Sequence, residues 1–507
     1  MNSAALRTLI IYAIILPLAV FVGMKLSGNM TTSSLAMLGF ILFVLVSPVI
    51  LKWHYPVLVF SWSSSLTLLF LPGKPGLWML MAVITFSLAI LNRIVQKQPA
   101  FIPAPSITIP LLLFGAVVLI TAKLRGGFGV QSLGGSTQGG KPYYYLLGGL
   151  LGYFAFASQP IPLERAKLYF SLFFLSGLVS IGSILIYKAG QPFYFLFLIF
   201  PMGAAAVQAI SEYSGSITRI AGLTVATSSV GYYLLGRFGI RGILQRWSRI
   251  LLLLLVLALG ALGGYRSVLV SFGLTFVILF IAEGLLRSPL FPALLLMGAL
   301  AFAALIPLAP KLPLSIQRSL SFLPLPIQQR VRMDAEGSLE WRFQIWRTTL
   351  PELPKYVWLG KGYAINPTEL YLAQQAELRN RTTHGRGHIL TGDFHSGPLS
   401  LFVPFGAFGT LAFLAFLIAS LRALYLNYRY GSDELRLINR FLFAYFCSRV
   451  IFFFAAFGVL AGDFAHFAGI IGFSVALNKG ICRKPVLIPK PVQFRGNLEL
   501  RGSASPA

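Results

Sequence analysis

Residues 251–280 read LLLLLVLALGALGGYRSVLVSFGLTFVILF and contain a single charged side chain, Arg266. The apolar run around it, residues 249–283, is too long for one helix across roughly 30 Å of hydrocarbon. A glycine pair, Gly263 and Gly264, interrupts the run near its middle. We therefore expect two membrane-spanning helices joined by a tight turn on the outer side, with Arg266 at that turn.

The rest of the chain has the same character. Of its 507 residues, 56% are hydrophobic, and the mean hydropathy is +0.78. A soluble domain of this composition would expose too much apolar surface to water. Recurring apolar runs predict an all-α fold, a polytopic bundle of about 12–14 spanning helices with one long outer loop. The predicted spans are 6–24, 33–51, 55–72, 76–93, 104–122, 142–158, 168–187, 219–236, 250–264, 267–285, 290–308, 397–420, 441–460 and 463–478.

Two segments need a separate interpretation. The first span, 6–24, is followed by more spans and lacks a clear cleavage site, so we expect a retained helix rather than a removed signal peptide. The segment 193–210 is apolar enough to cross, but counting it would move the basic residues 237–249 to the outer side. Positive-inside bias therefore favours an interfacial or re-entrant segment on the outer side.

The formal net charge is +27, and this excess does not indicate nucleic-acid binding. The basic residues are spread between hydrophobic segments rather than gathered in one stripe. They cluster in short links, which marks those links as cytoplasmic. The clusters are Arg237, Arg241, Arg246 and Arg249; Arg422, Arg429, Arg436 and Arg440; and the tail after Asn478. The only cysteines, Cys447 and Cys482, imply no disulfide.

We divide the chain into three parts. Residues 1–218 are N-terminal transmembrane helices, and residues 219–480 form a second transmembrane region that includes the long outer loop 309–395. Residues 481–507 are a basic cytoplasmic tail, which we expect to be disordered. Seven of the chain's 14 acidic residues and three of its five histidines lie in the loop, so its titratable groups are concentrated there. The stretch EWRFQIW, residues 340–346, predicts the start of a short helix that prolines at 351 and 354 end.

His395 lies where this loop meets the next apolar helix, in GDFHSGPLSLFVPFGAFG (392–409). An imidazole titrates near neutral pH, and Asp393 stands two residues before it, which suits a general base. The alternative is a histidine that only caps or anchors the helix at the interface. Gly406 and Gly409, a turn apart, predict the close approach of another helix.

Two arginines are expected on the same side as His395. Arg266 lies near the bilayer, where the cost of a charge favours a functional role over snorkelling to head groups. Arg342 lies in the predicted loop helix, where ordinary salt bridging is the alternative. Guanidinium groups bind phosphate through bidentate, charge-assisted hydrogen bonds. Together these residues predict a phosphate-binding site at the outer face.

Near the chain's C-terminus, Arg449 lies inside a predicted span and requires a partner, for which structural pairing is the first interpretation. Asp463 and His466, at the outer turn of the last hairpin, lie at the right level to join the site. A solvated turn is their alternative.

Neither a metal nor a cofactor is expected. His384 and His388, with Asp393 and His395, have a ligand-like composition, but glycines break the segment and remove helical ligand geometry. The Gly-rich stretch 126–140 lacks the Lys-Ser/Thr ending of a P-loop and is expected to be a flexible loop.

In this order, the residues over roughly 220–477 resemble the superfamily of O-antigen ligases and O-antigen polymerases, membrane enzymes of the bacterial envelope. The elements that carry the resemblance are an arginine at an outer turn (GGYRS, Arg266), Arg342-x3-Trp346, Gly360-x-Gly362, and His395-Ser396 followed by nine residues and Gly406-x-x-Gly409. The last element matches the family's His-[Asn/Ser/Thr/Gly]-x9-Gly-x-x-Gly pattern completely. Asp463 is the candidate for the family's acidic residue near the final spans.

The resemblance implies an inverting, metal-independent glycosyltransferase in the bacterial inner membrane, with its active site on the periplasmic side. The donor would be a glycan on undecaprenyl pyrophosphate, and the acceptor a sugar of lipid A-core for a ligase or of another lipid-linked repeat for a polymerase. His395, Arg266 and Arg342 would be catalytic. Asp393, Asp463, Trp346 and His466 would bind substrate, and membrane lipids would surround the spans.

A flippase or transporter for lipid-linked glycans is an alternative from another class, because many spans and interior charges such as Arg449 fit it as well. The loop argues against it, since a transporter has no need for titratable groups gathered on one face. Transporters often contain internal repeats, and none is apparent in this sequence.

Overall fold

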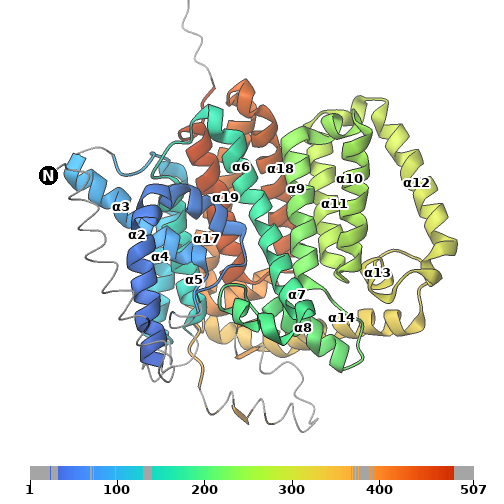
Figure 1. The fold of residues 1–507 in the computed structure, drawn as a ribbon, viewed down its shortest axis with the longest axis horizontal. Coiled ribbons are helices and arrows are strands. Elements are labelled where there is room, and N and C mark those ends of the chain that lie inside the picture. Colours follow the sequence, from blue (N-terminus) through green and yellow to red (C-terminus); the bar gives the residue numbers. More distant parts are fainter. Residues whose placement is uncertain are drawn as a thin grey trace, which may run out of the picture.

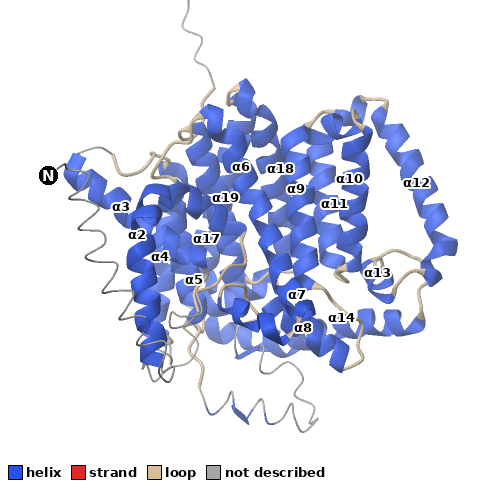
Figure 2. Cartoon of the chain, in the orientation of Figure 1, coloured by secondary structure: helices blue, strands red, loops and turns tan. Residues whose placement is uncertain are grey.

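The computed structural model describes residues 23, 32–68, 71, 74–96, 99–128, 140–366, 368, 371–372, 375, 389–390 and 392–484. Over these residues the fold is all-α, as expected: the elements are helices and loops, and Thr67 and Gly76 form an isolated β-bridge (Figure 2). The predicted span 6–24, apart from Gly23, and the tail from 485 onward lie outside the described residues.

The N-terminal half of the bundle is built from helices that pack around one aromatic core. They are α2 (Thr32–Ser63), α3 (Leu77–Gln96), α4 (Pro105–Arg125), α5 (Lys141–Phe156), and the continuous run of η2 (Leu163–Arg165), α6 (Ala166–Leu175), η3 (Ser176–Val179) and α7 (Ser180–Ala189).

The C-terminal half supplies most of the remaining helices. They are α9 (Ala221–Leu244), α10 (Trp247–Leu262), α11 (Arg266–Ala282), η5 (Leu285–Arg287), α12 (Leu290–Leu308), η6 (Ala309–Lys311), α17 (Gly397–Tyr430), η8 (Asp433–Leu435), α18 (Arg436–Ala455) and α19 (Leu460–Asn478). In Figure 1, α12 lies at the edge of the bundle, and it has no buried residue.

The prediction of about 12–14 spans covers the whole chain, and only the described helices can be compared with it. Seven of them are long and apolar enough to cross a membrane by length and composition. The predicted spans 33–51 and 55–72 are merged in α2, which is kinked at Trp53 and ends at Ser63. The turn at Gly263–Tyr265 leaves α10 and α11 as separate apolar helices, as expected, but with only 16 and 17 residues.

The segment 193–210 does not form a spanning helix, as the charge distribution predicted. It folds as η4 (Gln191–Leu198) and α8 (Gly203–Tyr213), separated by a turn. At 1.5 Å per residue, the 11 residues of α8 reach only about 17 Å, well short of the hydrocarbon thickness. Both elements pack on α7 at one end of the bundle (Figure 1).

Two ends of the bundle can be distinguished in Figure 1. One end, which we call the loop face, carries α8 together with α13 (Leu314–Ser319) and α14 (Gln329–Thr349). The links between α9 and α10 and between α17 and α18, which hold the arginine clusters of the sequence, lie at the other end. This separation is the one that positive-inside bias predicts.

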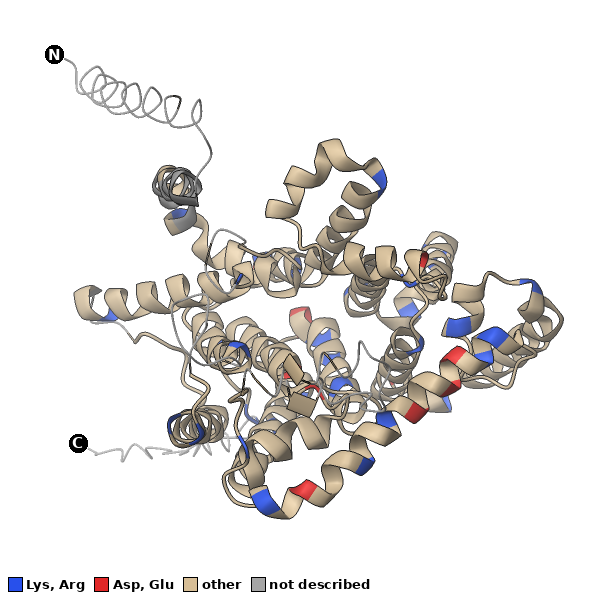
Figure 3. Ribbon diagram, turned by 90° about the horizontal axis from the view of Figure 1, so that it is seen from below, with Lys and Arg blue, Asp and Glu red and all other residues tan. Residues whose placement is uncertain are grey.

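The helix α14 crosses the loop face and carries many of the charged residues seen from that side (Figure 3). It begins at Gln329, so the expected short helix at 340–346 is the second half of a 21-residue helix. It ends at Thr349, immediately before the prolines, and the chain continues as η7 (Leu350–Tyr356).

Close packing of α5 against α19 depends on glycines. The indole of Trp62 lies between Gly152 and Gly469, where an added Cβ would come within 2.0 and 1.8 Å of the ring. Small residues let membrane helices approach closely because apolar burial alone does not drive their association. This contact fixes the height of α19 in the bundle, and with it the position of the residues at its N-terminal end.

Gly406 has a different role from the one expected. It has φ +61° and interrupts α17, and an added Cβ would lie 2.5 Å from the carbonyl group of Trp358. The element that approaches it is therefore the backbone of the loop rather than another helix. Gly409 does face a helix, since its nearest atom beyond Phe405 is the Val117 Cγ1 of α4, 3.6 Å from a built Cβ.

Four backbone hydrogen bonds join the loop to the interrupted helix. The amides of Lys361 and Gly362 donate to the carbonyls of Val403 and Pro404 at 2.7 and 3.0 Å. The amides of Ala407 and Phe408 donate to the carbonyls at 357 and 358 at 2.6 and 3.4 Å. These bonds satisfy the backbone groups that the break in α17 leaves without helical partners. We call residues 357–362, with their partners on α17, the loop–helix junction.

We expect Gly406→Ala to destabilise the loop–helix junction. At φ +61° and ψ −159° the backbone lies in a region that is essentially restricted to glycine and costs another residue about 1–3 kcal/mol. The new methyl group would also overlap the Trp358 backbone. The prediction is a lower Tm for the purified protein in detergent and faster proteolysis between residues 309 and 395. Gly298→Ala on α12 is the matched control, because nothing lies within 4 Å of its Cβ position. Equal Tm values for the two variants would contradict this account of Gly406.

Candidate functional site

A cavity of about 770 Å³ opens on the loop face, and we call it the arginine pocket. It is lined by Arg219, Tyr265, Arg266, Ser267, Arg318, Asp334, Gly337, Ser338, Trp341, Arg342, His395 and Phe457. The structure thus brings together Arg266, Arg342 and His395, three residues that the sequence predicted to act jointly.

Six separate segments supply these side chains, and the first is the link before α9, which carries Arg219. Arg266 begins α11 directly after the glycine turn, and Arg318 belongs to α13. Trp341 and Arg342 lie on α14, His395 precedes the N-terminus of α17, and Phe457 lies in the turn between α18 and α19. The pocket therefore exists only when the loop is folded onto the ends of the helices.

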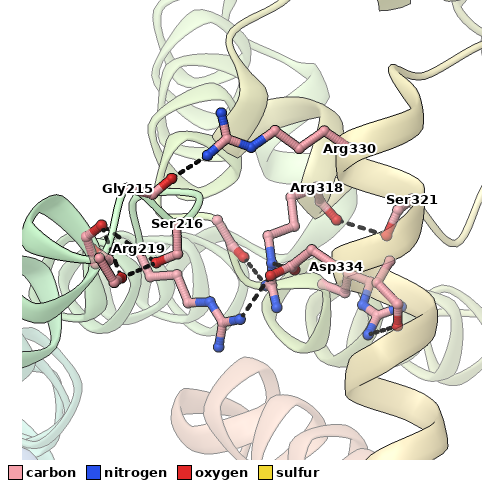
Figure 4. Close-up of polar contacts among 12 residues, drawn as sticks. Gly215, Ser216, Arg219, Arg318, Ser321, Arg330 and Asp334 are labelled. Atoms are coloured by element: carbon pink, nitrogen blue, oxygen red, sulfur yellow. Dashed lines mark hydrogen bonds and ion pairs between the residues drawn. The ribbon is translucent and has the colours of Figure 1, made fainter.

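Asp334 organises the arginine side of the pocket (Figure 4). Its Oδ2 lies 2.5 Å from Nε of Arg318, and its Oδ1 lies 3.4 Å from a terminal nitrogen of Arg219. Arg318 also donates to the carbonyl of Gly264 at 2.5 Å, which ties α13 to the turn before α11. One carboxylate thus positions two guanidinium groups from distant parts of the chain.

Arg330 makes a further tie outside the pocket. It donates to the carbonyl of Gly215, in the link between α8 and α9 (Figure 4). Together with Arg219, this contact holds the start of α9 against α14.

Positive charge is in excess in the pocket, because Asp334 is the one carboxylate among lining residues that include four arginines. Burial, and then repulsion from Arg318, lower the pKa of Arg342 from its ordinary value. The pKa of Arg318 is lowered by burial and by Arg219, although Asp334 opposes this. Arginine stays protonated at neutral pH even so. The folded state therefore maintains mutually repelling cations, an arrangement that a bound anion would relieve.

His395 lies at the other side of the pocket with its side chain 20% exposed. Its Nδ1 is 2.9 Å from Oδ1 of Asp393, and its ring packs edge-on against Trp341 and Phe457 at centroid distances of 4.8 and 5.2 Å. The guanidinium of Arg342 lies 5.5 Å from the centroid of the same Phe457 ring. The imidazole and this arginine therefore share one aromatic wall.

The backbone of His395 is strained, with φ +50°. A non-glycine residue in this region costs free energy that the surrounding structure has to offset, and such residues cluster at functional sites. Gly397 and Gly458 help to hold the strained segment in place. A Cβ on Gly458 would lie 2.8 Å from the Cα of Gly397, so the two backbones are in close contact.

Trp346 was predicted to bind substrate, and the structure places it outside the lining of the pocket. Its indole Nε1 donates to the carbonyl of Phe394 at 3.1 Å. It therefore fixes the peptide unit that leads into His395. Asp393, which was also predicted to bind substrate, lies next to the imidazole of His395, with Oδ1 2.9 Å from Nδ1.

Asp463 and His466 line a second cavity, of about 320 Å³, which we call the central well. It shares Ser267 and Phe457 with the arginine pocket. Arg449 has the structural partner that its position required, since it lies 2.5 Å from Oδ1 of Asp463. Asp463 and His466, which the sequence predicted to bind substrate, therefore lie next to the arginine pocket rather than in its lining.

Sequence reasoning missed Arg219, Arg318, Trp341 and Phe457 and did not single out Asp334 from the other acidic residues of the loop. A signal for the arginines was present. Both flank apolar runs at the end of the bundle that the sequence predicts to be outside, where positive-inside bias disfavours basic residues, so their presence there required an explanation. Nothing in the sequence pairs Phe457 with His395, because 61 residues and two helices separate them.

Among the described residues, no group of three or more His, Cys, Asp and Glu side chains is arranged to hold a metal ion. His384 and His388, which the sequence placed in a candidate ligand set, lie outside the described residues, as do residues 129–139 of the Gly-rich stretch.

Comparison with protein families finds one match, described as O-antigen ligase, over residues 247–414. Residues 247–414 form an O-antigen ligase domain. The match includes Arg266, Arg318, Arg342 and His395 and is narrower than the resemblance that the sequence motifs carried. No curated protein matches the chain. The family's members are ligases and polymerases of surface-polysaccharide biosynthesis that use lipid-linked glycans, and this chain is a multi-pass membrane protein with such a domain.

If the arginine pocket of this O-antigen ligase domain is an anion site, inorganic pyrophosphate should raise the protein's Tm. At 100 times Kd, a ligand specific for the folded state adds about 2.7 kcal/mol of stability. Arg342→Gln should weaken pyrophosphate binding about 10–100-fold, since a hydrogen bond to a charged group contributes about 1.5–3 kcal/mol.

The matched control is Arg347→Gln, on the same helix but with a side chain that is 77% exposed. It should leave the pyrophosphate-induced Tm rise unchanged. An equal loss in both variants would mean that the anion binds to general surface charge rather than in the pocket.

Proposed function

We propose that this protein is an inverting glycosyltransferase that moves a glycan from undecaprenyl pyrophosphate to an acceptor sugar. One observation carries the proposal: four arginines and a histidine paired with Asp393 line a single cavity. The arginines suit a pyrophosphate, and the histidine suits a proton transfer. The O-antigen ligase domain, whose family uses lipid-linked glycans, supports the same chemistry.

In the proposed reaction, an acceptor hydroxyl oxygen forms a bond to the anomeric carbon of the donor while the bond from that carbon to the pyrophosphate oxygen breaks. The electron pair leaves with the pyrophosphate, and the hydroxyl proton passes to His395. Attack opposite the leaving group inverts the anomeric configuration. Arg266 and Arg342 stabilise the charge that develops on the pyrophosphate, because preorganised donors act most strongly where charge grows.

Asp393 determines which nitrogen of His395 is the base. Its carboxylate oxygen Oδ1 lies 2.9 Å from Nδ1, a contact that favours a proton on this nitrogen and leaves Nε2 to accept the proton of the hydroxyl. As the imidazolium forms, the carboxylate stabilises its charge. This reaction requires no metal ion and no cofactor, since guanidinium groups neutralise the leaving group.

The proposed location is the bacterial inner membrane, with the loop face in the periplasm. The basic links at the opposite end of the bundle support this orientation. The arginine pocket then lies at the level of lipid head groups, where the pyrophosphate of a membrane-bound donor would reside. The acceptor would be lipid A-core for a ligase, or a second lipid-linked repeat for a polymerase.

We expect His395→Ala to lower the rate of glycan transfer by about 10²–10⁴-fold, the usual effect of removing a positioned base. The assay combines purified protein with an undecaprenyl-pyrophosphate oligosaccharide, with and without lipid A-core, in the presence of EDTA. A lipid A-linked product identifies a ligase, and a longer lipid-linked chain identifies a polymerase.

His54→Gln is the control, because His54 contacts Thr85 and Gln159 far from either cavity. It should transfer glycan at the wild-type rate. Wild-type activity in His395→Ala would refute the catalytic role. If isolated protein transferred no glycan while cells required it for surface glycan, a flippase or transporter would replace the present proposal.

Trp346→Phe should lower kcat about 2–10-fold and leave donor KM nearly unchanged. The substitution keeps the ring but removes the hydrogen bond to Phe394, which contributes about 0.5–1.5 kcal/mol. Trp358→Phe, at a side chain that is 67% exposed, is the control. A rise in donor KM with constant kcat would show instead that Trp346 binds substrate directly.

A further inference from the structure

The central well lies inside the bundle, next to the arginine pocket. Side chains of α9, α11, α18 and α19 form most of its lining, and Ser63 at the end of α2 adds to it. The two cavities meet at Ser267 and Phe457, which line both. The proposed roles of His395 and of the arginines do not involve the central well.

The lining of the central well is polar and aromatic. Hydroxyl groups come from α9 and α11, and aromatic rings come from α6, α9 and α18. Tyr232 and Ser271 hydrogen-bond to each other at 3.0 Å across the wall. The hydroxyls of Thr224, Ser228 and Ser229 donate to carbonyls of their own helix, and their oxygens can still accept hydrogen bonds. An isoprenoid tail offers no donor to these oxygens. The lining therefore favours an oxygen-rich ligand with apolar ring faces.

Arg449 and Asp463 give the well a fixed donor. Asp463 accepts from Arg449 at 2.5 Å and from the amide of Val459 at 2.8 Å, so the pair is held rigidly. Nε of Arg449 is buried and has no hydrogen-bond partner among the described residues. A guanidinium group has five N–H donors, so Arg449 retains donors beyond the one that Asp463 accepts.

We propose that the central well binds a sugar ring of the glycan substrate, an inference that rests on the proposed function. Its volume of about 320 Å³ is at the lower end of the range of small-molecule sites, roughly 300–1,000 Å³, and suits one ring rather than a chain. Hydroxyl and guanidinium groups pair with ring hydroxyls, and aromatic side chains pack on ring faces.

The connection between the cavities places this ring where transfer would occur. Ser267 directly follows Arg266, and Phe457 contacts both His395 and the guanidinium of Arg342. A ligand with its ring in the well and its phosphates in the arginine pocket has the bond between them at this shared wall. That bond is the one that breaks in the proposed reaction.

Binding of two probe lipids tests the proposal without turnover: bare undecaprenyl pyrophosphate, and the same lipid bearing one hexose. Ser228→Phe places a ring in the well, and Tyr232→Phe removes one of its hydroxyls. We expect Ser228→Phe to raise the Kd for the sugar-bearing lipid about tenfold or more, and Tyr232→Phe to raise it about 2–10-fold. Both variants should bind the bare lipid with the wild-type Kd, which also shows that they fold.

Ser248→Phe, on the exposed N-terminal turn of α10, is the matched control and should change neither Kd. If the well variants bind the sugar-bearing donor normally but raise KM for the acceptor, the ring belongs to the acceptor, which overturns the assignment of the well to the donor sugar. An equal rise in Kd for the bare and the sugar-bearing lipid would overturn it, because the well would then bind the isoprenoid chain or the phosphates. Unchanged donor Kd and unchanged acceptor KM would overturn it as well.

The proposed function can fail separately. If the wild-type protein transferred no glycan, the enzymatic proposal would be refuted, while a sugar-dependent difference in Kd that disappears in Ser228→Phe would still support the well as a sugar site.

Discussion

The site depends on four backbone hydrogen bonds between the interrupted helix α17 and residues 357–362 of the loop. A helix break inside a membrane bundle leaves amides and carbonyls without partners, which is tolerated only where other protein groups satisfy them. Here the loop supplies those groups, and Gly360 and Gly406 permit the approach because side chains at either position would overlap backbone atoms. The loop is thereby attached to the helix that follows His395, and α14 gains a fixed position over the pocket.

A second constraint acts on charge. The arginine pocket gathers four guanidinium groups with one lining carboxylate, and burial together with mutual repulsion lowers the pKa of Arg318 and Arg342. Asp334 offsets part of it by pairing with Arg318 and Arg219. Stability and function therefore oppose each other at this site, because the uncompensated charge that costs free energy is what suits the pocket to a pyrophosphate.

Where the sequence did not anticipate the structure, a physical reason can be given. Hydropathy by itself does not register a kink such as that of α2 or the shortness of α10 and α11. Gly406 was assigned to helix packing, because the spacing of small residues does not say whether a helix or a loop backbone approaches. For Trp346, which the sequence assigned to substrate, the structure adds a hydrogen bond from its indole to the carbonyl before His395, a long-range contact that no local pattern indicates.

The sequence by itself determined the class of protein and the identity of three residues in the pocket. Long recurring apolar runs indicate helices that cross a bilayer. Arg266, Arg342 and His395 stand out because charged and titratable groups are costly in or near the hydrocarbon. Only the tertiary structure decided which distant residues complete the site. Arg219, Arg318, Asp334 and Phe457 reach it from separate segments, through contacts that depend on loop closure and on glycine-mediated helix packing. Such long-range contacts leave no local pattern in the sequence, whereas burial and charge do.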